Sequence, residues 1–148
     1  MEYGEFYTFV KGTTAREAFN KAKEEAIAKY GNNSHSCSVL QKEEFKEFPA
    51  DITVINDMCE SKINSIAGKE RTAESREEII ELREKKSRLK KEKSHFKNRS
   101  KRTGKDKATA IAHFIIEIEP EEINAPEKPA GIVQALKNEW LVFGLANE

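Results

Sequence analysis

The chain has 148 residues, 37% of them hydrophobic, which is enough for one domain with one hydrophobic core. Its 26 basic and 26 acidic residues cancel to a formal net charge of zero, which argues against a protein that is basic or acidic throughout. No apolar run reaches the roughly 18 residues of a membrane span, and the N-terminus lacks a signal-peptide core, so we expect a cytoplasmic protein without membrane contact.

The N-terminal segment predicts a strand followed by a helix. Residues 5–11 (EFYTFVK) are aromatic and β-branched, which favours a strand. Thr14 and Glu17 have the spacing of a capping box, in which the hydroxyl and the carboxylate satisfy the first free N–H groups of a helix. Apolar residues then recur at helical spacing as far as Tyr30, and Gly31 is placed to end the helix.

The middle of the chain predicts mainly helix. A polar loop over residues 32–36 leads into residues 37–41, which we expect to form a second strand. Apolar residues recur at helical spacing over residues 51–66, which favours a helix ending at Gly68, although the first five residues also suit an extended chain. Residues 72–102 carry one long helical pattern.

This long pattern has only a thin apolar seam. Leu82, Leu89 and Phe96 are seven residues apart, the spacing of one coiled-coil position, but Lys86 and Lys93 fall on companion positions and spoil a true coiled coil. We therefore expect the helix to pack along part of its length and to project for the rest. The narrow seam and the opposite charges of two parts of the chain predict a homo-oligomer, with a dimer favoured.

The C-terminal segment predicts further strands. Residues 109–119 alternate in a strand-like pattern whose first half is apolar on both faces, as in a central strand. Residues 131–136 and 139–143 flank Lys137 and Asn138, which predicts a tight hairpin because Asn tolerates a positive φ.

Together these elements predict a single α+β domain over residues 1–148. We expect an antiparallel or mixed sheet of about five strands, with the N-terminal helix packed on one face and a long basic helical segment in the middle. Within the domain, residues 1–48 would form a strand–helix–strand unit, residues 49–107 a helical insertion or arm, and residues 108–148 the C-terminal strands.

The basic residues concentrate in one segment. Residues 85–107 contain twelve Lys or Arg and two acids, a local charge of +10 that leaves −10 for the rest of the chain. The segment could be a solvated face paired with acids of the same chain or of a second subunit, a binding surface for an anionic ligand or nucleic acid, or a disordered insertion. The acidic remainder would repel DNA unless it faced away. For a small anion we single out Arg99 and Arg102, because the guanidinium fork suits phosphate better than an ammonium does.

A second candidate site is the polar loop between the first helix and the next predicted strand. Asn33, Ser34, His35 and Ser36 offer amides, hydroxyls and an imidazole that could hold a nucleotide, or they could form an ordinary connection. The loop lacks the glycines of a phosphate-binding loop. Trp140 is most simply a core aromatic, although an exposed indole could stack on a base.

Catalysis and metal binding find little support. Cys37 and Cys59, with three scattered histidines, match neither a disulfide framework nor a zinc motif, so we expect no metal and no cofactor. No nucleophile elbow or paired-carboxylate motif is present, so we assign no catalytic residue. His113 lies in an apolar segment and is interpreted as a satisfied core residue rather than as a base.

Two terminal stretches resemble small, mostly uncharacterised phage and prophage proteins. The first stretch matches their strand, Gly-Thr helix start and Tyr-Gly loop at Lys11, Gly12, Thr13, Ala18, Phe19, Tyr30 and Gly31. The last matches their terminal strands in type at Lys128, Pro129, Ala130, Phe143, Gly144 and Ala146. Departures occur at Cys37-Ser38 and Leu145, and residues 50–107 have no counterpart.

The resemblance implies a viral setting in the host cytoplasm, where small accessory proteins often antagonise host defence. The function we expect is a non-enzymatic antagonist that binds and sequesters an anionic, nucleotide-type immune signal. A protein-binding inhibitor of a defence effector, such as a CRISPR nuclease, is the main alternative. Direct nucleic-acid binding is the second alternative.

Overall fold

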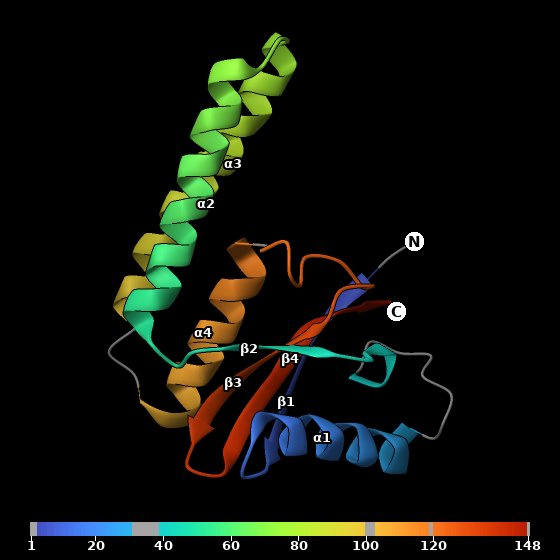
Figure 1. The fold of residues 1–148 in the computed structure, drawn as a ribbon. Coiled ribbons are helices and arrows are strands. Elements are labelled where there is room, and N and C mark those ends of the chain that lie inside the picture. Colours follow the sequence, from blue (N-terminus) through green and yellow to red (C-terminus); the bar gives the residue numbers. More distant parts are fainter. Residues whose placement is uncertain (1–2, 31–38, 100–102, 119, 148) are drawn as a thin grey trace.

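The structure is a computed structural model that describes residues 3–30, 39–99, 103–118 and 120–147. The described elements, in chain order, are β1 (Tyr3–Lys11), α1 (Ala15–Tyr30), the 3-10 turn η1 (Val39–Gln41), β2 (Phe45–Phe48), α2 (Ile52–Thr72), α3 (Arg76–Arg99), α4 (Gly104–Ile118), β3 (Ala130–Leu136) and β4 (Glu139–Asn147). The α+β class is therefore confirmed. Figure 1 shows a sheet with helices on both faces and a long helical hairpin that projects from it.

The described sheet is mixed and has four strands in the order β1-β4-β3-β2, where about five were expected. β4 pairs antiparallel with both β1 and β3, whereas β2 runs parallel to β3. The β3–β4 hairpin confirms the sequence prediction, and Asn138 has the positive φ of 62° that its turn requires. The strand expected over residues 37–41 is wrong where the structure describes it, because residues 39–41 form η1.

Helix α1 covers one face of the sheet. Its start confirms the capping residues: the Glu17 backbone N–H donates to Thr14 Oγ1 at 3.1 Å, and the Glu17 carboxylate accepts from the backbone and hydroxyl of Thr13. Small residues on the inner face let the helix approach closely, since Ala18 and Ala22 are buried against Phe6 and Val10 of β1. β1 and α1 thus form the packed strand and helix that their sequence predicts.

Helix α4 covers the opposite face, where the sequence analysis placed a strand. That prediction over residues 109–119 is wrong, because residues 104–118 are helical. The segment is buried on nearly every side, so its apolar residues fit a period of two as well as a period of 3.6. His113 and Glu117, which are exposed and four residues apart, mark the solvent side of the helix. The interpretation of His113 as a core residue is therefore also wrong.

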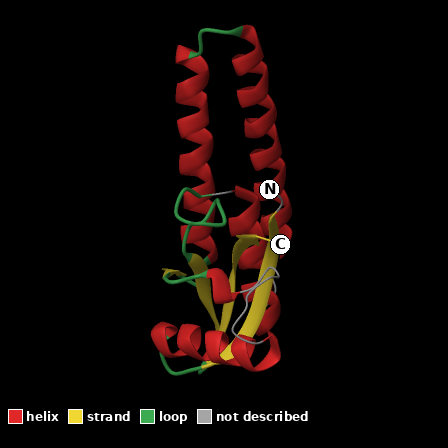
Figure 2. Cartoon of the chain, turned by 90° about the vertical axis from the view of Figure 1, so that its right-hand side faces the viewer, coloured by secondary structure: helices red, strands yellow, loops and turns green. Residues whose placement is uncertain are grey.

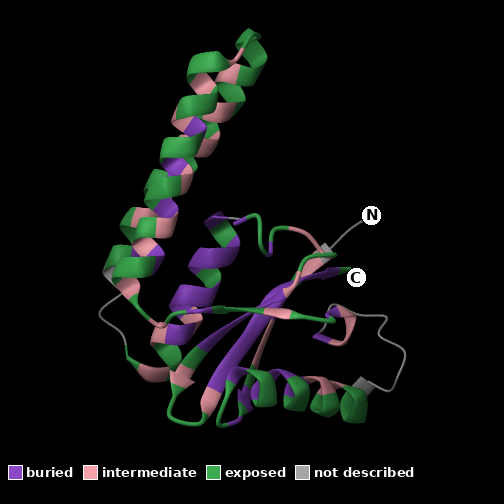
Figure 3. Ribbon diagram, viewed as in Figure 1, coloured by how far each residue is buried: buried purple, intermediate pink, exposed green. Residues whose placement is uncertain are grey.

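The arm, which we define as α2 and α3, forms an antiparallel helical hairpin (Figure 2). The helix predicted over residues 51–66 is confirmed, with Asp51 Oδ1 accepting from the backbone of Thr53 and Val54. It does not end at Gly68 but continues to Thr72. The expectation of an arm that packs at one end and projects at the other agrees with the burial pattern in Figure 3.

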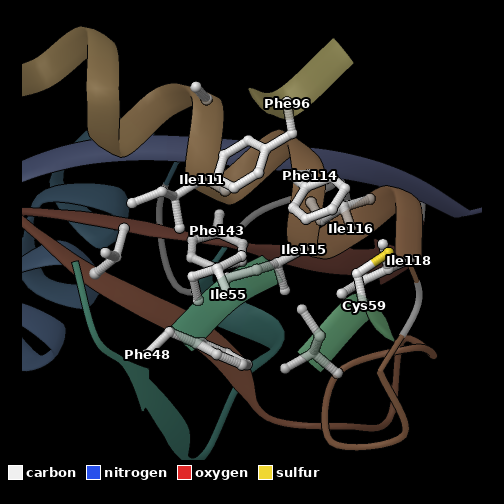
Figure 4. Close-up of a cluster of buried hydrophobic side chains, with 14 of the residues drawn as sticks. Phe48, Ile55, Cys59, Phe96, Ile111, Phe114, Ile115, Ile116, Ile118 and Phe143 are labelled. Atoms are coloured by element: carbon white, nitrogen blue, oxygen red, sulfur yellow. The ribbon is translucent and has the colours of Figure 1, made fainter. Parts of the chain in front are cut away.

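A continuous core joins the arm to α4 and the sheet. The seam residues Leu89 and Phe96 are fully buried within the chain, against the inner face of α2. Phe96 stacks on Phe114 of α4, with ring centroids 4.2 Å apart, in the cluster of Figure 4. Two of the three seam residues are therefore covered within the chain, whereas Leu82 is only partly buried, and the dimer stays a prediction.

Candidate functional site

The sequence-predicted site residues are only partly placed. Asn33, Ser34, His35, Ser36 and Arg102 lie outside the described residues, so the proposed loop site stays a prediction. Arg99 ends α3, but its side chain is likewise outside the description.

Trp140 is a core residue and not a stacking surface. Only 7% of it is exposed, and its indole Nε1 donates to the carbonyl oxygen of Gly12 at 2.9 Å. This bond ties the start of β4 to the turn between β1 and α1. The interpretation of Trp140 as a core aromatic is confirmed, and a role for it in ligand binding stays a prediction.

The basic segment is partly neutralised by acids of the same chain. Lys86 pairs with Glu70 at 2.7 Å, and Lys93 pairs with Glu60 at 2.5 Å. Both carboxylates belong to α2, and hydrogen bonds from these lysines hold their pKa values below the ordinary range. Lys86 and Lys93, whose positions do not suit a coiled coil, therefore form ion pairs between α3 and α2. These pairs reduce the positive charge that is available to bind nucleic acid.

The connection between α4 and β3, residues 120–129, is rich in proline, and we call it the proline loop. Hydrogen bonds from Lys42 anchor it. Lys42 is only 2% exposed, and its Nζ donates to the carbonyl oxygens of Pro126 and Lys128, both at 2.7 Å. Ile123 is buried in the core on the arm side of the sheet. Charge-assisted bonds of this kind are among the stronger hydrogen bonds in proteins, so they hold the proline loop in a defined position.

A groove of about 700 Å³ is lined by residues of the arm and of the proline loop. We call it the lysine groove. Its lining residues are Ser61, Lys62, Ser65, Ile66 and Lys69 of α2, Lys85 of α3, and Glu121, Glu122, Asn124 and Lys128 of the proline loop. The volume is in the range of small-molecule sites.

The lysine groove carries an excess of positive charge. Its described lining contains four lysines and two glutamates, together with two serines, one asparagine and one isoleucine. Lys62, Ser65 and Lys69 are three and four residues apart, which places them on one stripe of α2. Such a set can hold phosphate or carboxylate oxygens through point charges and hydroxyl donors, and it offers no aromatic ring for a base.

Among the described residues, no group of three or more His, Cys, Asp and Glu side chains could hold a metal ion. The His113 ring lies 4.3 Å from the Tyr7 ring on the protein surface. Cys59 is fully buried, and this burial raises the pKa of its thiol to about 11, which keeps it protonated and unreactive at neutral pH.

Sequence reasoning missed the lysine groove because its residues come from three separate segments. The lysines of α2 have no distinctive motif, and the contribution of Lys42 depends on carbonyl groups more than eighty residues further along the chain. The one available signal was the stripe of Lys62, Ser65 and Lys69, which borders the buried seam of α2, since Ile66 of that seam also lines the groove.

Comparison with family models, with curated proteins and with solved structures finds no match to this chain. The resemblance to phage proteins therefore stays an expectation carried by the two terminal stretches alone. Among the described residues, no helix is long and apolar enough to cross a membrane.

Proposed function

We propose that this protein binds a small, phosphate-bearing ligand of the nucleotide type in the lysine groove without converting it. The observation that carries the proposal is the convergence of Lys62, Lys69, Lys85 and Lys128 on one groove. The proline loop, opposite α2, is already held by Lys42, so binding would cost little conformational entropy for ordering this loop. In the setting implied by the resemblance, such binding would sequester a host immune signal.

The lining suggests which part of the ligand is recognised. Lysines bind phosphate as point charges, whereas bases are usually held by stacking or edge contacts. Because none of the described residues that line the lysine groove is aromatic, we expect the phosphates to supply most of the affinity and the base to supply little. Tripolyphosphate should therefore compete with a nucleoside triphosphate.

The first experiment is titration calorimetry with ATP, a cyclic dinucleotide and tripolyphosphate. The double variant Lys69→Gln/Lys128→Gln should bind at least tenfold more weakly, because it removes two of the four charges. Lys46→Gln/Lys91→Gln removes two exposed lysines that do not line the groove, and it should bind as the wild type does.

Two outcomes would overturn this proposal. One is the absence of binding to all three compounds, together with no small molecule released from the purified protein on heating. The other is binding that the groove variant leaves unchanged. A ligand with two or three phosphates should also show a shallow salt dependence, whereas steep loss of affinity between about 50 and 200 mM salt would indicate nucleic acid.

A further inference from the structure

The outer edge of β1 is an open strand edge. β1 is the first strand in the sheet order and pairs on one side with β4, in unbroken register from Tyr3 opposite Asn147 to Lys11 opposite Glu139. No strand in the described part of the chain pairs with its other side. An open edge presents backbone N–H and C=O groups that can pair with another strand.

The two edges of this sheet differ in how they are protected. β2, at the far edge, has only four residues, carries the exposed charges Lys46 and Glu47, and is followed by Pro49. These are common devices against edge-to-edge pairing. β1 has nine residues, no proline and no bulge. Among the described strands, the longer edge is thus the one with neither proline nor bulge, and its exposed charges, Glu5 and Lys11, are of opposite sign.

The sequence of β1 is complementary to itself when two copies run antiparallel about Thr8. In that register Glu5 lies opposite Lys11, Phe6 opposite Val10, and Tyr7 opposite Phe9 of the other copy. Each pair therefore joins opposite charges or apolar side chains, and the two-fold axis repeats each pair. A parallel arrangement in register would instead place Glu5 beside Glu5 and Lys11 beside Lys11.

The faces of the strand agree with this register. Phe6 and Val10 pack toward α1, so their pairing would extend the apolar layer on that face. Tyr7 packs on the α4 side, and Phe9 on the same side is 36% exposed beneath the ammonium of Lys105, 5.1 Å from its ring centroid. A second copy would add aromatic contact where the chain leaves a ring in solvent.

We propose that two copies of this chain pair through the outer edges of β1, antiparallel about Thr8, to form a symmetric dimer with one continuous eight-stranded sheet. The interface is isologous, because each copy supplies the same strand. This dimer does not depend on the arm seam, and it does not depend on the lysine groove.

The charge pair at each end of the interface allows a test by reversal. Light scattering of the full chain at tens of micromolar should show a dimer. Glu5→Lys and Lys11→Glu should each weaken the dimer at least tenfold, because each places like charges opposite one another. An equimolar mixture of the two variants should recover the dimer, since each then meets the opposite charge. Lys46→Glu on β2 should have no effect.

A cross-link provides the second measurement. Residues directly opposite in antiparallel strands have Cα atoms about 4.5–5.5 Å apart, which is within disulfide range. Thr8→Cys in a Cys37→Ser background should therefore form a disulfide between two copies on mild oxidation, whereas Lys46→Cys in the same background should not. A wild type that stays monomeric overturns the proposal. A dimer that is insensitive to both reversals, or that fails to cross-link at position 8, does the same.

Discussion

Gly131 lies directly beneath the ring of Phe143, its partner across the β3–β4 hairpin. A Cβ atom added at Gly131 would meet ring atoms of Phe143 at 2.4–2.5 Å, closer than any real contact. The ring is fully buried, so it cannot swing out into solvent without exposing apolar surface. The absence of a side chain at this position is thus a packing requirement and not a turn requirement.

We predict opposite effects for alanine at two glycines. Gly131→Ala should destabilise the protein by about 1–3 kcal/mol, because it overpacks the core. Gly68→Ala should stabilise it by about 0.5–1 kcal/mol, because Gly68 is inside α2 with nothing within 4 Å of the added methyl group. Urea unfolding of both variants measures the difference, and equal effects would contradict the packing described for Gly131.

The buried thiol of Cys59 predicts a dependence of stability on alkaline pH. The folded state keeps the thiol protonated up to a pKa of about 11, whereas the unfolded chain loses this proton near its ordinary value of 9.0. The contribution of this thiol to the free energy of unfolding is constant below about pH 9. It declines as the pH rises toward 11, by about 1.4 kcal/mol per pH unit.

The measurement is urea unfolding at about pH 8 and about pH 10 in a Cys37→Ser background. Cys59→Ala should be less stable at the lower pH, because it leaves a small cavity, but its stability should fall less between the two values. Parallel declines in the two proteins would show that Cys59 does not titrate as its burial implies.

At the scale of elements, the arm is held by a few buried residues near its base. Leu89 is fully buried, whereas Ile80, nearer the tip on the same helix, is 48% exposed. Leu89→Ala should cost about 2–5 kcal/mol, and Ile80→Ala should change stability by no more than about 0.5 kcal/mol. Thermal unfolding followed by circular dichroism measures both changes in stability. A large loss of stability in Ile80→Ala would mean that this side chain is buried against another molecule at the tip of the arm.

The helices and strands differ in how well the sequence predicted them. The first helix and the C-terminal hairpin were predicted because local signals decide them: the cap at Thr14 and the turn at Asn138. α4 was missed because a helix buried on nearly all sides loses the polar face that distinguishes it from a strand. β2 was missed because its residues FKEF are mostly exposed, so only its place beside β3 makes it a strand.

At the scale of the whole molecule, the candidate site depends on tertiary structure that no local pattern encodes. The lysine groove is lined by the arm and the proline loop together. The proline loop is in turn held by a hydrogen bond from Lys42, which belongs to a distant segment of the chain. The basic segment was visible in the sequence, but the acids that neutralise Lys86 and Lys93 lie on the neighbouring helix and could not be assigned to them.

The strand order also has a consequence for how the chain folds during synthesis. Among the described strands, β1 pairs with β4 and β2 pairs with β3, so both edge strands depend on the C-terminal hairpin. The arm can form from neighbouring segments as they leave the ribosome, but the sheet cannot begin until residues 130–147 have emerged. Until then Phe6, Phe9 and Val10 stay uncovered by strand partners on both sides. β1 therefore stays without a strand partner until these last strands have emerged, and we expect a ribosome-associated chaperone to bind this aromatic segment in the meantime.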